Sequence, residues 1–370
     1  MPTHDSLLTA LLGAFPNEVF LVGQYADPNL GFGKEARIFI PDFHWMSRQT
    51  LQRFTGGYEF NGGNNRGGKP LFGTLLDLLE DWKGQDANVE VYQLGDSFDL
   101  WREVTSAAEG AQVAYDRVRN DPLVKPLADR LVALGTKFIR GNHDAWLKST
   151  KSDLPSLEDT YEPAGGKIFV THGHRYDNIE RILPDDVKDF FVQLATTVKP
   201  RSLWVGAFSN ASIKKLSQFL TNRKSPDFPT NIYPPVQPQG AIKITSVTGP
   251  AELAGAWKFY LDVRGFSHGS GSRDDFEHAD YLQFGDRIFA QESIHATDHT
   301  LYVIGHTHHA RLLVDETAFG KPLVTMDCGG WIEWCHVKQT PNASAEVVPS
   351  AQVGVQQGNE VRIYQLGGGR

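Results

Sequence analysis

The sequence predicts an α/β fold with a largely parallel sheet and helices on its faces. Three observations predict this class. Short runs of β-branched and aromatic residues, typical of strands buried on both faces, recur along the chain. Segments with apolar residues at helical spacing separate the first runs, which is the βαβ order of a parallel sheet. Several runs end in a polar motif containing Asp, Asn or His.

The expected elements alternate through the first half of the chain. The predicted helices cover residues 5–14, 71–82, 104–119 and 122–134, and the predicted strands cover residues 36–41, 89–93, 137–140 and 167–170. Gly84 ends the second helix before the next strand begins. Residues 55–70 contain six glycines around Asn and Arg residues, which predicts a mobile loop over the strand ends.

The second half of the chain predicts fewer helices and more strands. A helix is expected over residues 284–294, followed by a strand over residues 301–304. Short strands at 311–314, 323–326, 332–337 and 361–365 are expected to complete a second sheet, with a loop over 342–357.

Composition bounds the classes of protein to consider. The chain has 370 residues and a net charge of −8, which argues against extended nucleic-acid contact because that normally requires a basic face. No run of about 18 apolar residues predicts a membrane span, and the first 15 residues lack the features of a signal peptide. Two cysteines predict neither a disulfide framework nor a Cys-based zinc site. We therefore expect a cytoplasmic protein, with peripheral membrane contact and oligomeric state left open.

Five predicted strand ends carry side chains that could bind a metal ion. They are Asp42-Phe43-His44, Gly95-Asp96-Ser97-Phe98-Asp99, Gly141-Asn142-His143-Asp144, Thr171-His172-Gly173-His174 and Gly305-His306-Thr307-His308. The carboxyl ends of parallel strands gather at one edge of a sheet, so these groups are expected to converge. Nitrogen and oxygen donors without a thiolate suit Mn, Fe or Zn. The sequence therefore predicts a metal site at this edge.

In this order the five motifs resemble the signature of the calcineurin-like metallophosphoesterase superfamily, which reads DxH, GDxxD, GNHD, H and GHxH. The resemblance covers residues 36–176 and 284–337 and implies a four-layer α-β-β-α sandwich of two mixed sheets. It places a dinuclear metal site at the strand C-terminal ends. It implies that Asp42, His44, Asp96 and His308 hold the first ion and that Asp96, Asn142, His172 and His306 hold the second. Asp96 would bridge the two ions.

The same resemblance implies a reaction. Two divalent or trivalent ions, Mn in the first place with Fe or Zn as alternatives, would promote attack of a metal-bound hydroxide on a phosphomonoester, phosphodiester or pyrophosphate. His143 matches the general acid of the superfamily, and Asp99 matches the carboxylate that orients it. Asp99 also stands where purple acid phosphatases have a tyrosine ligand, so no tyrosinate–iron chromophore is expected. Asp144 fits the motif but equally predicts a turn or a helix N-cap, while His172 is preferred over His174 as the ligand.

Residues 178–283 predict an inserted cap between the two parts of a core domain, 1–177 and 284–370. The chain has 306 − 172 = 134 positions between His172 and His306, far more than one crossover needs. Prolines and apolar stripes in this segment predict short helices. These stripes either pack on the core or form a wall for a bulky or lipid-like substrate. Both roots of the segment are expected at the rim of the metal site.

Two alternatives to a general phosphoesterase are considered. Residues 95–101 and 327–333 loosely resemble the branch that contains UDP-2,3-diacylglucosamine pyrophosphatases, which act on a lipid-bearing nucleotide. Many members of that branch have arginine where this chain has His143, and the cap here is longer. The second alternative is a non-catalytic metal-binding scaffold, against which the complete ligand set and His143 argue. The expected partner is a phosphate-ester small molecule or a lipid-linked substrate, and the sequence leaves the natural substrate open.

Overall fold

The structure is a computed structural model of the 370-residue chain. It describes residues 4–15, 19–51, 59–60, 62, 65–66, 69–85, 88–103, 110–174, 300–306, 308, 310–315, 323–338, 344–349 and 351–366. The predicted cap, residues 178–283, and the predicted helix over 284–294 lie outside these ranges.

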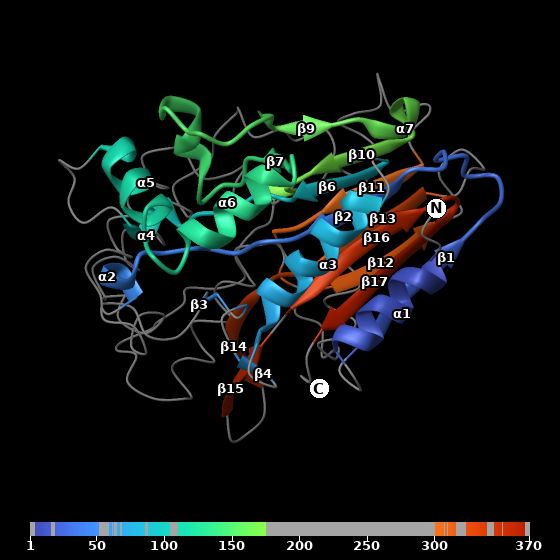
Figure 1. Ribbon diagram of the computed structural model, residues 1–370, viewed down its shortest axis with the longest axis horizontal. Helices are drawn as coiled ribbons and strands as arrows, with labels where there is room; N and C mark the ends of the chain where they lie inside the picture. Colours follow the sequence, from blue (N-terminus) through green and yellow to red (C-terminus); the bar gives the residue numbers. More distant parts are fainter. Residues whose placement is uncertain are drawn as a thin grey trace, which may run out of the picture.

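The larger sheet has seven strands, which run diagonally through the molecule in Figure 1. In order they are β1 (Val19–Ala26), β17 (Glu360–Leu366), β16 (Gln352–Gln357), β2 (Ala36–Ile40), β6 (Val89–Gln93), β7 (Lys137–Ile139) and β8 (Leu157–Glu158). The strands from β2 to β8 pair in parallel, and the strands from β1 to β2 pair antiparallel. The sheet is therefore mixed, with the expected parallel half formed by the βαβ part of the chain.

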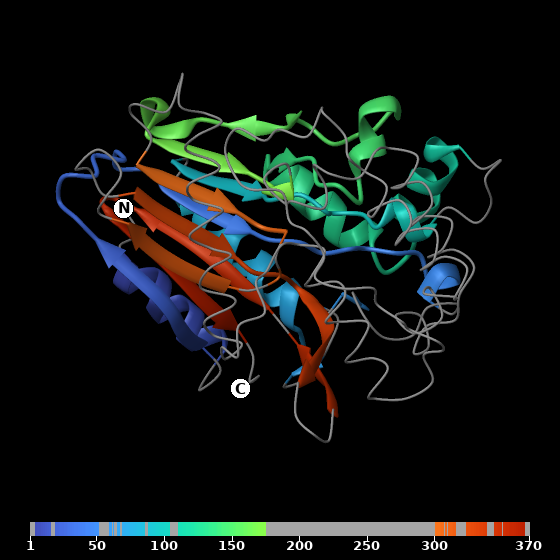
Figure 2. The same cartoon turned by 180° about the vertical axis from the view of Figure 1, so that it is seen from behind.

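The second sheet has five strands and is also mixed. In order they are β12 (Ala310–Asp315), β13 (Leu323–Cys328), β11 (Leu301–Ile304), β10 (Ile168–Thr171) and β9 (Thr160–Tyr161). The two inner pairs are parallel and the two outer pairs are antiparallel. Figure 2 shows this sheet in front of the larger one. The prediction of two mixed sheets is confirmed.

A core of apolar side chains fills the space between the two sheets. Its members are fully buried and include Phe39, Leu94, Ile139, Val170, Val303 and Met326, which come from strands of both sheets. Strands of the larger sheet are apolar on both faces, because one face packs against the second sheet and the other packs against helices. This explains why their sequences read as continuous apolar runs.

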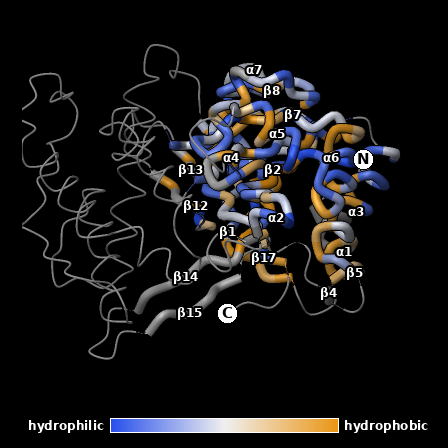
Figure 3. The backbone as a smooth tube through the Cα atoms, turned by 90° about the vertical axis from the view of Figure 1, so that its left-hand side faces the viewer, coloured by the Kyte–Doolittle hydropathy of each residue, from blue (hydrophilic) through white to orange (hydrophobic). Residues whose placement is uncertain are grey.

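Helices cover the outer face of the larger sheet. They are α1 (His4–Ala14), α3 (Leu71–Gln85), α5 (Ala111–Arg119) and α6 (Lys125–Ala133). Leu75, Leu79 and Trp82 of α3 pack in the same core as Ile38 and Val91 of the sheet. Hydrophobic and hydrophilic residues both occur along α1 and α3 in Figure 3, as expected for helices with one buried face. The described residues thus form helix, sheet and sheet layers of the expected sandwich.

The short elements lie in the connections. They are α2 (Arg48–Leu51), α4 (Leu100–Glu103), α7 (Pro163–Gly166), the 3-10 helix η2 (Ala145–Ser149), and the strands β3 (Glu59–Phe60), β4 (Asn65–Arg66), β5 (Lys69–Pro70), β14 (Ile332–Lys338) and β15 (Ser344–Pro349). β15, β14 and β3 form a small sheet, and β4 pairs with β5. No helix of the described residues is long and apolar enough to cross a membrane.

Several strand assignments made from the sequence are wrong. The loop expected over 342–357 contains β15 and β16, and β16 joins the centre of the larger sheet by pairing with β2. β17 belongs to that same sheet, and β14 belongs to the small one, so neither completes the second sheet. β1 was not expected at all. The Gln-rich sequence of β16 has few apolar residues, but its alternating Val353 and Val355 are buried in the helix-side core.

Both expected cap roots, at residues 178 and 283, lie outside the described residues, but the flanking strands show where the chain leaves and re-enters the sheet. β10 and β11 are neighbouring parallel strands, with Ile168 opposite Leu301. The amide of Thr300, just before β11, donates to the carbonyl of Lys167, just before β10. Residues 175–299 therefore leave the sheet at the end that carries His172 and must return to its opposite end. The predicted helix over 284–294 falls in this interval, so the position of the cap roots at the rim of the site stays a prediction.

Candidate metal centre

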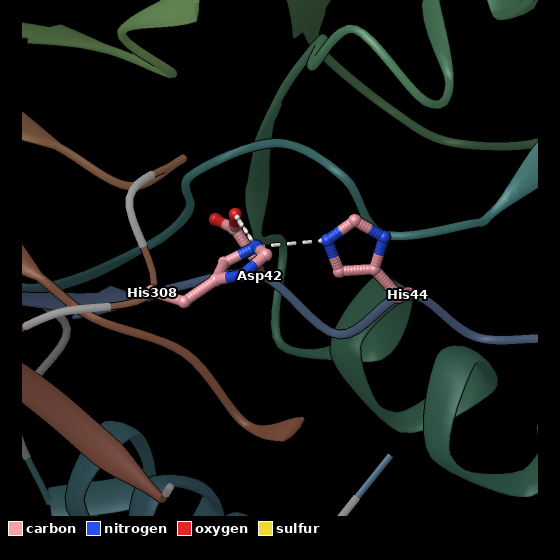
Figure 4. Close-up of side chains that lie close together, drawn as sticks. All are labelled: Asp42, His44 and His308. Atoms are coloured by element: carbon pink, nitrogen blue, oxygen red, sulfur yellow. Dashed lines mark hydrogen bonds and ion pairs between the residues drawn. The ribbon is translucent and has the colours of Figure 1, made fainter. Parts of the chain in front are cut away.

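Three side chains from two separate strand ends form the first donor set. Asp42 and His44 follow β2, and His308 follows β11. His308 Nε2 lies 3.1 Å from Asp42 Oδ2 and 3.0 Å from His44 Nε2. Figure 4 shows the His308 ring linked to both partners. One ligand atom from each residue lies within 4.8 Å of the others, which is close enough to share one metal ion.

A second donor set lies next to the first. Asp96 follows β6, His172 follows β10 and His306 follows β11, and their ligand atoms again lie within 4.8 Å of one another. Asn142, which follows β7, joins this set because its Oδ1 lies 3.0 Å from His172 Nε2. The structure therefore brings together all seven residues predicted as metal ligands.

Asp96 lies between the two donor sets. Its Oδ2 is 3.2 Å from His172 Nε2 and 3.6 Å from His44 Nε2. Its other oxygen, Oδ1, accepts a hydrogen bond from the backbone amide of His143 at 2.8 Å. This amide orients the carboxylate so that one oxygen faces both sets.

The hydrogen bonds around His172 fit a cation at the second set. Its Nδ1 lies 2.8 Å from the carbonyl oxygen of Leu94, which can only accept a hydrogen bond, so Nδ1 carries a proton. In the neutral ring Nε2 then presents a lone pair to the oxygens of Asp96 and Asn142. Three acceptor atoms facing one another repel unless a proton or a metal ion lies between them. Imidazole, carboxylate and amide donors suit Mn, Fe or Zn, so the residues fit such an ion.

The pKa values in the cluster also indicate that its carboxylates favour a positive charge beside them. Burial alone would lower the pKa of His172, but the carboxylates of Asp96 and Asp42 raise it to about 10. Burial would raise the pKa of Asp96, but the imidazoles of His172 and His143 hold it well below its ordinary value. At the first set, burial and the neighbouring His143 lower the pKa of His44 to about 4. Without a metal ion the site therefore holds a proton on His172 and keeps Asp96 ionised.

His143 and Asp99 form a pair beside the first donor set. His143 Nδ1 lies 3.0 Å from Asp99 Oδ1, and Asp99 is fully buried while the His143 side chain is 15% exposed. Asp99 Oδ2 lies 3.5 Å from His44 Nδ1, and the rings of His44 and His143 meet edge to face with centroids 4.5 Å apart. One carboxylate thus contacts both the histidine expected as general acid and a histidine expected as a metal ligand.

The backbone of the centre is strained. Among the described residues, six that are not glycine have positive φ, and four of them are expected ligands: His44, Asp96, His306 and His308. Their φ values lie between 48° and 71°, the left-handed region that costs a residue with a Cβ about 1–3 kcal/mol. Such strain persists only where surrounding contacts fix it and is concentrated at functional sites.

Glycines precede three of the ligands for different reasons. Gly95 has a φ of 99°, which is the sharp exit expected from the sequence. Gly141 and Gly305 instead lie against other chain segments. A Cβ on Gly141 would overlap the backbone and carboxylate of Asp96, and a Cβ on Gly305 would overlap the carboxylate of Asp42. The two ligand carboxylates therefore occupy the space that these glycines leave.

Two residues that support the centre were not identified from the sequence in these roles. Asp144 was expected to be part of the motif or a turn or N-cap residue, and it does occupy the N-cap position of η2. Its fully buried carboxylate makes no capping hydrogen bond there; it accepts hydrogen bonds from the amides of Gly141 and Ser97 and so joins two motif loops. Burial and the Asp96 carboxylate raise the pKa of Asp144 to about 7. Gln93 is also fully buried and binds the Asp96 loop. A signal was available, because Gln93 interrupts the apolar face of Val89 and Val91.

Two further histidines, His174 and His309, lie near proposed ligands in the sequence. The ring of His174 lies 5.2 Å from that of His172 and 6.4 Å from that of His306. His172 rather than His174 contacts Asp96 and Asn142, as the sequence analysis preferred. His309 lies outside the described residues. Cys328 is buried in the core between the sheets.

Comparison with known proteins finds matches among solved structures alone. The chain matches no protein-family model, and no curated protein gives a significant match. Solved structures that match include the crystal structure of a conserved uncharacterized protein, a predicted phosphoesterase, from Streptococcus pneumoniae. It is 11% identical, with a TM-score of 0.25, and the alignment covers 90% of this chain and 98% of that one. Both values are too low for this likeness to indicate the activity of the present chain.

Proposed function

We propose that this protein is a phosphoester hydrolase that depends on two metal ions. The observation that carries the proposal is the position of Asp96, whose Oδ2 faces His172 of one donor set and His44 of the other at 3.2 and 3.6 Å. A carboxylate shared by two N/O donor sets is the arrangement that two-metal hydrolases use. The pair formed by His143 and Asp99 next to this carboxylate supplies a proton donor.

The proposed ligands divide into two sets, one for each metal ion. Asp42, His44, Asp96 and His308 would hold one ion, and Asp96, Asn142, His172 and His306 would hold the other. Two such ions, when bound, supply Lewis-acid stabilisation of the phosphoryl oxygens and lower the pKa of a coordinated water. The backbone amides of His143 and His306 orient the carboxylates of Asp96 and Asp42, so that each carboxylate is fixed before a substrate arrives.

His143 would act as the general acid. With Nδ1–H donated to Asp99, the protonated ring can pass the proton on Nε2 to the leaving oxygen as the P–O bond breaks. Asp99 would stabilise the imidazolium form and hold the ring plane, the role that a carboxylate beside a catalytic histidine performs. Its contact with His44 keeps this pair next to the first donor set.

The substrate is a phosphomonoester, a phosphodiester or a pyrophosphate. The narrower alternative of a lipid-bearing nucleotide gains no support from the comparisons. Trp331, in one of the two stretches that suggested it, is fully buried, packs against Phe72 and donates its indole N–H to the carbonyl of Gln352. The Trp331 side chain therefore contributes to packing of the core. The lipid-nucleotide activity therefore rests on a sequence resemblance alone.

The proposal is tested by metal content and hydrolysis together. The full chain, stripped with a chelator and reloaded with Mn²⁺, should bind close to two ions and hydrolyse p-nitrophenyl phosphate or bis(p-nitrophenyl) phosphate. The rates on the two esters separate a monoesterase from a diesterase. Asp42→Asn should weaken Mn²⁺ binding and abolish most of the hydrolysis, because it removes a ligand charge from the first donor set.

A matched exposed carboxylate provides the control. Asp129, on α6, pairs with Lys125 and is 45% exposed, so Asp129→Asn should leave metal binding and hydrolysis unchanged. Two bound ions without hydrolysis of either ester, or of a metabolite library, would instead identify a metal-binding scaffold. A chain that binds no metal after careful loading would overturn the proposal at its base.

A further inference from the structure

Gln93 forms hydrogen bonds with the residues on both sides of Asp96. This residue ends β6 and is fully buried on the face that continues Val89 and Val91. Its Nε2 donates to the carbonyl of Gly95 at 2.7 Å, and its Oε1 accepts from the amide of Gly95 at 3.1 Å. The same Oε1 accepts from the hydroxyl of Ser97 at 2.5 Å. A buried amide on an apolar face is costly unless every polar atom is bonded, and here both are.

These hydrogen bonds fix one of the two peptide planes that flank Asp96. The carbonyl of Gly95 belongs to the peptide that precedes Asp96, and Gln93 Nε2 holds it. The following peptide is fixed from the other side. Its carbonyl, on Asp96, accepts from the amides of Phe43 and His44, and its amide, on Ser97, donates to Asp144.

The rotation between these two planes is the φ and ψ of Asp96. Asp96 has a φ of 48° and Gly95 has a φ of 99°, neither of which a residue with a Cβ adopts readily. The first plane is held by a side-chain amide of the same strand, and the second is held by the neighbouring motif loops. Without Gln93, the carbonyl of Gly95 loses its hydrogen bond from a side chain. Asp96 can then relax toward an ordinary backbone conformation.

We propose that Gln93 is a positioning residue for the shared carboxylate: it holds the loop at 94–97 in its left-handed conformation and thereby places Asp96 Oδ2 between the two donor sets. This inference rests on the proposed function, since it concerns the metal ions that Asp96 would share. It assigns to Gln93 no contact with substrate. If the Asp96 carboxylate moved away from one donor set, the affinity for the second ion would fall first. The magnetic exchange coupling between the two ions would also be lost.

The test compares two buried glutamines. Gln93→Met keeps the size of the side chain and removes all three hydrogen bonds. Gln356 is the matched control, because it is also fully buried on a strand and its Nε2 donates to the carbonyl of a glycine two residues on, Gly358, at 2.7 Å. Gln356 contacts Arg37 near the start of β2, at the opposite end of that strand from the site. Gln356→Met therefore reports the general cost of losing a buried amide.

Binding of Mn²⁺ to the full chain is the readout, by competition with a chelating dye and by electron paramagnetic resonance of the metal-loaded protein. Gln93→Met should weaken Mn²⁺ binding by about 10- to 100-fold, the usual effect of removing a group that orients a metal ligand, and should reduce the exchange-coupled signal. Gln356→Met should bind Mn²⁺ within about 2-fold of wild type, because it lies outside the centre.

The outcomes separate the two proposals. Equal Mn²⁺ binding and equal coupling in the two variants would overturn the role of Gln93 and leave the two-metal function in place. A wild-type chain that binds no Mn²⁺ would overturn both. If Gln93→Met fails to fold, Ser97→Ala removes only the hydroxyl bonded to Gln93 Oε1 and should weaken binding by about 2- to 10-fold. Unchanged binding in that variant would also overturn the inference.

Discussion

At the scale of single residues, the candidate centre is held by backbone amides that come from other motifs. The amide of His143 orients Asp96, and the amide of His306 orients Asp42. These two motifs therefore supply candidate ligands and also fix the candidate ligand of another motif. The sequence predicted that these candidate ligands would converge, because Asp, Asn and His recur at strand ends. It could not predict these amide contacts, since the partners are 47 and 264 residues apart and meet only when the sheets assemble.

The pair formed by His143 and Asp99 carries the first residue-scale prediction. His143→Ala should leave Mn²⁺ content nearly unchanged, because the imidazole belongs to neither proposed ligand set, and should lower turnover by about 10²- to 10⁴-fold. The loss should shrink for aryl phosphates with acidic leaving groups, which need little protonation. Turnover on a series of phenols of different pKa measures this. An equal loss across the series would make His143 a substrate-binding residue instead of an acid.

At the scale of elements, parallel strand ends approach so closely that glycine becomes the only residue that fits. β6 and β7 are neighbours in the sheet, and the turn after β7 crosses the carboxylate that follows β6. The sequence predicted these strands from apolar runs and predicted the helices from spaced leucines. The sequence did not predict β16, because glutamines surround its two buried valines. It also did not predict β3, which lies in a Gly-rich stretch expected to be a mobile loop. Phe60 of β3 packs edge to face against Phe43 and Phe72. Pairing with a distant strand, β14, decides its structure.

Gly141 allows the element-scale argument to be tested. A methyl group at this position would overlap Asp96, so Gly141→Ala should displace the carboxylate and weaken Mn²⁺ binding by about 10-fold or more. The substitution should also lower the free energy of unfolding by about 1–3 kcal/mol, the usual cost of overpacking.

The control for this prediction is Gly84, which lies in α3 with nothing within 4 Å of an added Cβ. Gly84→Ala should leave Mn²⁺ binding unchanged and raise the free energy of unfolding by up to about 1 kcal/mol, because alanine favours a helix. Chelator competition and urea denaturation measure both quantities. Wild-type Mn²⁺ affinity in Gly141→Ala would show that the close approach of the two strand ends does not set the position of Asp96.

At the scale of the whole molecule, two mixed sheets present their strand ends at one edge, and a long segment separates two adjacent strands of the smaller sheet. Because β10 and β11 are parallel, residues 175–299 must travel from the site to the far end of the sheet. A crossover between parallel strands needs at least about a dozen residues, and this segment is roughly ten times longer. Its length and apolar stripes were evident in the sequence. The direction of its return was not, because it depends on which strands become neighbours.

This geometry shapes the last prediction, that residues 178–283 determine which substrate is accepted and leave the chemistry to the core. The segment begins four residues after His174, whose ring lies 5.2 Å from that of His172, so we expect its first part to reach the non-phosphate part of a substrate. Binding energy from such remote groups raises turnover of a whole substrate without affecting a small ester. A short Gly/Ser linker is sufficient as the replacement, because residues 284–299 remain to recross the sheet before β11. That variant should keep Mn²⁺ binding and most hydrolysis of p-nitrophenyl esters, and should lose most activity on the natural substrate once a phosphate-release screen has identified it. Trp204 and Phe208 belong to one of the apolar stripes predicted in this segment, so Trp204→Ala with Phe208→Ala tests the same point without a deletion. If a folded variant lost metal binding and small-ester hydrolysis together, residues 178–283 would belong to the catalytic core.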